Sequence, residues 1–211
     1  GVQTCALPIY GEWFRRGLER TLKGRLPHGV TADVMYRNAQ LCLTAEEELF
    51  RVFYYDCPPY EGVETNPIDQ SKVDFKQQPK HQARTRFLNE LKTMDFVALR
   101  LGIAKQRGWT LSEAYIRQTI TGKHQPPQAN DVFLSLERKG VDMRIGIDVA
   151  TLALKHIVDR IILLSGDTVM IPAMKLARRE GVQVVLVELG LPIHKSLDED
   201  ADLVRTLTPV P

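Results

Sequence analysis

The 211-residue sequence lacks the long hydrophobic runs of membrane proteins. No stretch approaches the roughly eighteen apolar residues of a membrane-spanning helix, so no membrane segment is predicted. Cysteine is scarce too: three residues, an odd number without a CxxC spacing, argue against structural zinc and favour a reducing, cytoplasmic compartment. A net charge of only +2 neither identifies nor excludes a nucleic-acid-binding protein.

Phosphate-binding glycine motifs are also missing. The sequence contains neither a GxGxxG after a predicted strand nor a GxxxxGK[ST], so dinucleotide-binding and P-loop chemistry are not predicted. Its cysteines have no local histidine partner, which disfavours a thiol nucleophile. Its histidines show no metal-ligand spacing. With 44% apolar and 26% charged residues, the composition is that of one globular domain.

Hydrophobic periodicity predicts alternating helices and strands. Helices are expected over residues 11–26, 31–43, 80–94, 111–120, 141–156, 171–180 and 195–206, and strands over 48–55, 96–103, 132–137, 160–164 and 182–189. Residues 58–78 are predicted to be a loop and 105–129 a polar insertion. Strands that are apolar on both faces and separated by helices indicate an α/β fold with a mainly parallel sheet covered on both sides. A functional site is then expected beyond the carboxyl ends of the strands.

The first nine residues, GVQTCALPI, resemble the translated end of a sequencing adapter. We therefore expect Gly1–Ile9 to be an artefact without a structural role, and the domain to cover residues 10–207. In that case the natural N-terminal sequence is absent.

Acidic residues follow the predicted strands or begin the helices after them. Asp167 follows the strand RIILL, Asp142 opens the helix after Lys139-Gly140, and Asp148 lies near the middle of that helix. Each has a structural interpretation: a helix N-cap, a helix-dipole partner and a solvated helix face, respectively. Asp56 ends another strand and could line the same edge. Converging carboxylates would suit Mg²⁺, which prefers oxygen ligands and can activate water for phosphodiester hydrolysis.

Three stretches resemble the bacterial NYN-domain proteins of the PIN-like metal-dependent ribonuclease group: LFRVFYYDCPPYEG, ERKGVDMRIGIDVATLA and RIILLSGDTVMIPAMKLARREGVQVVLV. The resemblance covers residues 11 to about 205. It implies a Rossmann-like, PIN-type three-layer fold and an acidic cluster at the carboxyl edge of the central strands. Asp142, Asp148 and Asp167 match the cluster and would be its catalytic, metal-binding residues.

The sequence departs from the family pattern at two positions. The family implies an aspartate at Val169, and valine cannot bind a metal. The family's opening Asp-Gly motif ends a first strand that we expect to be missing here, with Gly11 as the motif glycine and Tyr10 in place of the aspartate. Tyrosine and aspartate codons share their last two bases, so an adapter ending in T would convert an Asp codon to Tyr at the fusion point.

Three functional hypotheses remain open. The first is a Mg²⁺- or Mn²⁺-dependent ribonuclease, in which Lys139, Arg144, Thr168 and Lys175 would contact RNA. The second is a catalytically weak or inactive RNA- or protein-binding module of the same fold. Its contact surface would be the insertion with its cationic and aromatic residues, Lys105, Arg107, Trp109, Arg117 and Lys123, although a solvated excursion also accounts for them. The third is an unrelated small-molecule enzyme. The oligomeric state is not predicted.

Overall fold

The computed structural model describes residues 1–122 and 125–211, and the chain forms two compact units. The first, here called the sheet unit, comprises Gly1–Asp56, Phe87–Gly102 and Gly140–Pro211. The second, here called the hairpin unit, comprises Cys57–Arg86 and Ile103–Lys139 and contains the predicted insertion. Lys123 lies outside the described residues. No helix in the described part of the chain is long and apolar enough to span a bilayer.

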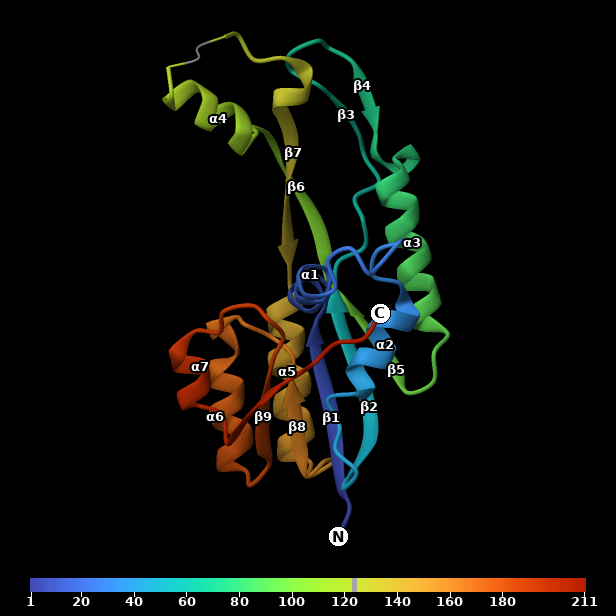
Figure 1. Cartoon of the computed structure of the whole chain (residues 1–211), viewed down its shortest axis with the longest axis vertical. Coiled ribbons are helices and arrows are strands. Elements are labelled where there is room, and N and C mark those ends of the chain that lie inside the picture. Colours follow the sequence, from blue (N-terminus) through green and yellow to red (C-terminus); the bar gives the residue numbers. More distant parts are fainter. Residues whose placement is uncertain (123–124) are drawn as a thin grey trace. The chain divides into compact units, whose positions relative to one another are not determined.

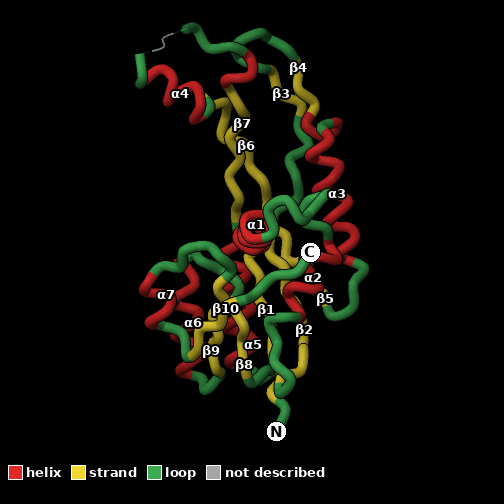
Figure 2. Tube along the Cα trace, in the orientation of Figure 1, coloured by secondary structure: helices red, strands yellow, loops and turns green. Residues whose placement is uncertain are grey.

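The sheet unit is built on six parallel strands in the order β10-β9-β8-β1-β2-β5 (Figures 1 and 2). The strands are β1 (Gln3–Tyr10), β2 (Glu47–Asp56), β5 (Val97–Leu101), β8 (Arg160–Leu163), β9 (Gln183–Glu188) and β10 (Leu203–Thr206). The central strands are buried on both faces, as their continuous apolar runs predict. The parallel α/β fold is therefore confirmed.

Helices cover both faces of this sheet. Alternate side chains of β1, such as Leu7 and Ile9, share one core with apolar residues of three helices: α1 (Gly11–Thr21), α2 (Ala32–Gln40) and the C-terminal part of α3 (Pro79–Lys92). On the opposite face, Ile161 and Leu163 of β8 lie against α5 (Val141–Leu154) and α6 (Ile171–Arg179). The layers are those of a Rossmann-like, PIN-type fold.

The central strand β1 corrects one expectation. We predicted that Gly1–Ile9 would have no structural role and that the first strand would be missing, yet Gln3–Tyr10 forms a strand between β2 and β8 (Figure 1). Cys5, Ala6, Leu7 and Ile9 are completely buried. An uncharged apolar segment satisfies the hydrogen bonds of both neighbours and fills both core layers, and these are the requirements of a central strand. The adapter origin of these residues stays a prediction.

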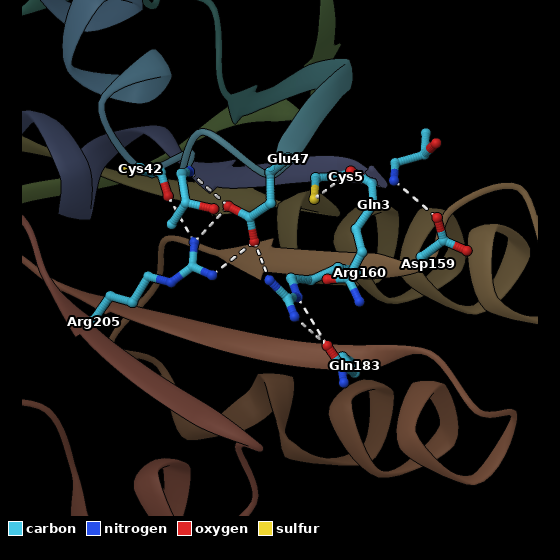
Figure 3. Close-up of polar contacts among 10 residues, drawn as sticks. Gln3, Cys5, Cys42, Glu47, Asp159, Arg160, Gln183 and Arg205 are labelled. Carbon is cyan, nitrogen blue, oxygen red and sulfur yellow. Dashed lines mark hydrogen bonds and ion pairs between the residues drawn. The ribbon is translucent and has the colours of Figure 1, made fainter. Parts of the chain in front are cut away.

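A buried carboxylate fastens the amino-terminal edge of the sheet (Figure 3). Glu47, at the start of β2, has a fully buried side chain that pairs with Arg160 of β8 and Arg205 of β10. Its Oε2 also accepts the backbone N–H of Thr44 at 2.8 Å. Burial alone raises the pKa of Glu47, but the hydrogen bonds from Arg205, Thr44 and Arg160 outweigh it and lower the pKa to about 2. One acidic side chain thus joins three strands.

The C-terminal prediction was partly wrong. Instead of a helix over 195–206, a short helix α7 (Lys195–Glu199) is followed by the edge strand β10, which pairs with β9 (Figure 2). Val204 and Arg205 pair with Leu186 and Val187. The free edge of β9 supplies backbone partners that outweigh the helical pattern of this short segment.

The hairpin unit consists of two antiparallel strand pairs with short helices. One pair joins β3 (Val63–Thr65) to β4 (Lys72–Asp74) within the predicted loop, and a single 3₁₀ turn at Phe75–Gln77 follows. The other pair joins β6 (Ile103–Leu111) to β7 (Val132–Lys139), with α4 (Glu113–Ile120) and a 3₁₀ turn at Ala129–Asp131 between them. Strand β6 lies in the predicted polar insertion and is not expected from the sequence, and its pairing with the strand predicted at 132–137 is not expected either.

Candidate active site

The carboxyl ends of β1 and β8 meet where the strand order reverses. From β1 the chain proceeds to β2 on one side, while β8 pairs with β1 on the other. The backbone N–H of Tyr10 donates to the carbonyl of Leu164 at 3.0 Å, so the two strand ends stay together. Open parallel sheets bind ligands at such a reversal. The residues that follow these two strands are therefore the candidates for a functional site.

Asp167 follows β8 in the turn Ser165-Gly166-Asp167. Its Oδ1 accepts the backbone N–H of Val169 at 3.1 Å, and its own N–H donates to Ser165 Oγ at 3.2 Å. Asp167 thus caps the 3₁₀ turn Thr168–Met170. The indole of Trp13 occupies the space that a Cβ on Gly166 would need. The capping interpretation is confirmed, and the Asp167 side chain is exposed.

Asp142 lies in the first turn of α5, where the charge of Asp167 affects its pKa. Burial raises the pKa of Asp142, and the negative charge of Asp167 raises it further. The preceding Gly140 has a left-handed backbone (φ +74°), and the Arg144 guanidinium reaches back to donate to its carbonyl at 2.9 Å. The first helical turn thus carries the Asp142 carboxylate, and the Asp167 carboxylate is close enough to repel it.

Asp148 does not join these two carboxylates. Its Oδ2 accepts hydrogen bonds of 2.8 Å from Tyr55 Oη and of 2.8 Å from Arg100 Nε. Six residues along a helix advance about 9 Å, which separates Asp148 from Asp142 on the helix axis. Burial and the neighbouring Asp148 carboxylate raise the pKa of Tyr55 far above its usual range, so the phenol stays a hydrogen-bond donor. Sequence reasoning missed both partners of Asp148.

Asp56 ends β2 as expected, but its side chain is buried. It is 3% exposed, and its Oδ2 lies 3.4 Å from Tyr54 Oη. Gly11 packs so closely that a Cβ there would overlap Tyr54 and lie 2.8 Å from Asp56 Oδ2. Glycine is therefore required sterically at the start of α1. The family resemblance identifies Gly11 as the motif glycine but does not give this reason.

The remaining candidates have mixed positions. Thr168 and Val169 are exposed beside Asp167, and Val169 is 51% exposed. Lys175 of α6 forms an ion pair with Asp200 at 3.5 Å. Lys139 belongs to the hairpin unit and pairs with Glu137 at 3.6 Å. Of the predicted phosphate-binding residues, Arg144 and Thr168 are next to the acidic pair in the chain.

The donor set suits a hard divalent cation that keeps water ligands. Within residues 1–122 and 125–211, no group of three acidic, histidine or cysteine side chains is arranged to hold a metal ion. Mg²⁺ is commonly bound by one or two carboxylates together with waters and substrate phosphates. The pair Asp142 and Asp167 fits that coordination because a cation would offset the repulsion that, after burial, raises the pKa of Asp142.

Comparison with known proteins decides the family. The model of the NYN domain matches residues 73–203, more than half of the chain. The chain belongs to the NYN domain family. NYN domains are in general metal-dependent, nuclease-like domains that bind RNA. The match includes Asp142, Asp148 and Asp167 and ends within β10, whereas β1 and β2 precede it.

Among solved structures, this NYN-domain protein is similar in fold to a protein of unknown function from Vibrio parahaemolyticus. The TM-score is 0.53 at 15% sequence identity, and the alignment covers 98% of this chain and 94% of the other. At that identity the similarity concerns the fold alone. No curated protein matches the sequence significantly.

Proposed function

We propose that this NYN-domain protein is a Mg²⁺- or Mn²⁺-dependent endoribonuclease whose cation is held by Asp142 and Asp167. The observation that carries the proposal is the placement of two carboxylates from different elements at the carboxyl edge of the sheet: Asp167 follows β8, and Asp142 opens α5. Burial and then the charge of Asp167 raise the pKa of Asp142. Two like charges kept close together raise the free energy of the metal-free protein unless a proton or a cation neutralises them. The three cysteines are buried thiols, which agrees with a reducing, cytoplasmic location.

In this proposal the protein's own groups orient the RNA. A bound divalent cation would supply an activated water and neutralise the leaving oxygen of the phosphodiester. The Val169 N–H holds the Asp167 carboxylate in a fixed direction. Arg144, which follows Asp142 by half a turn, and the exposed Thr168 hydroxyl are donors for phosphate oxygens. Lys175 would contact a further phosphate once its ion pair with Asp200 is broken.

We assign Asp148 the role of a positioning residue. Its hydrogen bonds to Tyr55 of β2 and Arg100 of β5 fasten the middle of α5 to the sheet. Because Asp142 is on the same helix, this attachment fixes the position of Asp142 along the helix axis relative to the strand ends. The role differs from the metal ligand that the family resemblance implies.

A second candidate is an RNA- or protein-binding module that cleaves weakly or not at all. Two observations favour it: Tyr10 occupies the end of the central strand, and Val169 occupies the turn beside Asp167. Neither side chain can bind a metal through a carboxylate. Among the described residues, no group of three acidic, histidine or cysteine side chains is arranged to hold a metal ion.

Asp167→Asn distinguishes these functions. The amide retains an oxygen that can accept the Val169 N–H but removes the charge that the cation needs. We expect calorimetry to show loss of Mn²⁺ binding, with a change in unfolding free energy below about 1 kcal/mol. RNA cleavage that is present with Mn²⁺ and absent in EDTA should be lost with it.

Asp74→Asn is the matched control, because Asp74 also caps a 3₁₀ turn, accepting the Lys76 N–H at 3.0 Å. Unchanged Mn²⁺ affinity in Asp167→Asn would show that Asp167 is only a cap. RNA binding without cleavage under any divalent cation would favour the binding module.

A further inference from the structure

The hairpin unit carries the positive charge of this protein. Its residues include eleven Lys and Arg against seven Asp and Glu, a formal charge of +4, whereas the sheet unit has seventeen against nineteen, or −2. The overall value of +2 conceals this asymmetry. A localised positive charge is the electrostatic feature by which proteins attract nucleic-acid phosphates.

One face of the β6–β7 ladder gathers these cations. Lys105 pairs with Glu137 and Ile103 with Lys139 in the antiparallel register. Side chains two residues apart on a strand point to the same face, so Phe133 shares this face with Glu137 and Lys139. Phe133 is 50% exposed, and Lys105 and Lys139 are also exposed.

A β-bulge adds a further cation to the same face. The register shifts between Gln106 and Gly108, and Gly108 has a left-handed backbone with φ +96°. Arg107 is the extra residue, and its guanidinium forms an ion pair with Glu137. Bulges redirect side chains, and here the bulge turns Arg107 toward the face that Lys105 and Lys139 occupy.

The opposite face of the ladder is buried only around Leu134, and Leu136 on that face is 42% exposed. There Trp109 is opposite Leu134, which is only 7% exposed. On the first face, by contrast, three cations surround the single carboxylate of Glu137. The first face therefore carries both an excess of positive charge and, further along β7, an exposed aromatic ring. We call it the basic face and define it by Lys105, Arg107, Phe133, Glu137 and Lys139.

We propose that the basic face of the hairpin unit binds single-stranded RNA through residues other than Asp142 and Asp167. The three cations would contact successive phosphates, and the Phe133 ring would stack on a base, a combination that binds single strands with little sequence preference. The inference rests on the proposed function only in taking RNA as the polyanion. It does not require that the acidic pair bind a metal or cleave.

The test is RNA binding by the full chain in EDTA, where metal-dependent cleavage cannot contribute. The probe is a fluorescein-labelled oligouridylate, titrated between about 50 and 200 mM salt. The triple variant Lys105→Gln, Arg107→Gln, Lys139→Gln should bind at least about tenfold more weakly at the lowest salt, with a log–log salt slope smaller by about 2. The control removes the same charge from exposed positions of the sheet unit: Lys92→Gln, Arg179→Gln and Lys195→Gln.

Two single variants separate the contributions of ring and charge. Phe133→Ser should weaken binding by about fivefold or more without changing the salt slope, because stacking releases no counterions. Glu137→Gln should strengthen binding, because it removes the carboxylate that pairs with Arg107 and Lys139. Circular dichroism and thermal melting verify that each variant is folded.

Binding that survives the triple variant, or that the control lowers equally, would overturn the proposal. A loss of binding by Glu137→Gln in a folded protein would also overturn it. Failure of the basic face would leave Mn²⁺ binding by Asp142 and Asp167 unaffected. Loss of cleavage in Asp167→Asn would in turn leave RNA binding in EDTA unchanged, so the two proposals fail separately.

Discussion

Asp148 of α5 and Arg100 of β5 form a hydrogen-bonded ion pair with an Oδ2–Nε distance of 2.8 Å. The two side chains are 22% and 36% exposed, respectively, and the Tyr55 hydroxyl donates to the same carboxylate oxygen. The guanidinium of Arg100 also lies over the Phe53 ring, 5.2 Å from its centroid. The carboxylate is thus engaged by two donors, and this arrangement underlies its assignment as a positioning residue.

Asp148→Ala should therefore reduce stability more than it reduces metal binding. It leaves the mostly buried Tyr55 hydroxyl without its acceptor and Arg100 without its counter-charge, which should cost about 1–3 kcal/mol of unfolding free energy. Urea unfolding measures the loss, and calorimetry should show Mn²⁺ affinity within a few-fold of the wild type. An Arg100→Ala variant and the double variant complete a cycle. A large loss of Mn²⁺ affinity with unchanged stability would identify Asp148 as a ligand.

Adding carboxylates at the strand ends should improve the metal site. Tyr10→Asp introduces a third carboxylate at the end of β1 and an N-cap for α1, which has no side-chain cap now. Val169→Asp adds one in the turn beside Asp167. Crowded carboxylates raise one another's pKa values in the metal-free protein and are relieved by a cation.

We expect each substitution to tighten Mn²⁺ binding and to increase Mn²⁺-dependent RNA cleavage at fixed salt and pH. Leu203→Asp, which places a carboxylate on an exposed position of the edge strand β10, is the control for added negative charge. No gain from either change, in a protein that already cleaves well, would show that two aspartates suffice.

Glu47 should make stability depend on pH in the acid range. Its pKa is about 2 in the folded protein and 4.5 ordinarily, so the unfolded chain binds the proton more tightly. The stabilisation is fully present above pH 4.5 and declines as pH falls toward 2, by about 3 kcal/mol in total.

Denaturation midpoints measured between pH 6 and 2.5 test this expectation against Glu47→Gln. That variant leaves Arg160 and Arg205 without their shared counter-charge and should be about 3–5 kcal/mol less stable at neutral pH. Its stability should also fall less on acidification. A wild-type profile parallel to that of the variant would contradict the assignment.

Two glycines should respond to alanine with opposite signs. A methyl group on Gly166 would overlap the Trp13 indole, so Gly166→Ala should destabilise by about 1–3 kcal/mol and shift the Trp13 fluorescence. It should also weaken Mn²⁺ binding, because the displaced turn carries Asp167. Gly146 lies within α5 with nothing near its missing Cβ, so Gly146→Ala should stabilise by about 0.5–1 kcal/mol. Equal effects at the two positions would be inconsistent with the packing described here.

Most of the sheet unit could be predicted from periodicity. The apolar runs at 160–164 and 182–189 became β8 and β9, because strands buried on both faces need apolar residues throughout. The helices around Phe14, Met35 and Ile145 followed from apolar stripes that pack on the sheet. The positions of Asp167 and Asp142 could be predicted because Asp167 follows a buried strand and Asp142 lies in the first turn of a helix.

Other elements could not be predicted because their residues lack a periodic buried face. Strand β6 contains Lys105, Gln106 and Arg107 in succession, and it pairs with β7 in a two-stranded sheet. Such a ribbon buries little apolar area, so its pattern resembles a polar insertion. Strand β10 is an edge strand whose pairing with β9 exists only in the folded protein.

The sequence by itself therefore determined the layered parallel fold, the family and the two candidate ligands Asp142 and Asp167, since these depend on local pattern and on position after a strand. Only the tertiary structure decided that Gln3–Tyr10 fills the centre of the sheet, that Asp148 turns to Arg100, and that Arg107 joins Lys105 and Lys139 on one face. The physical reason is that sheet pairing, ion pairing and bulge direction depend on groups distant along the chain, whose proximity no local pattern records.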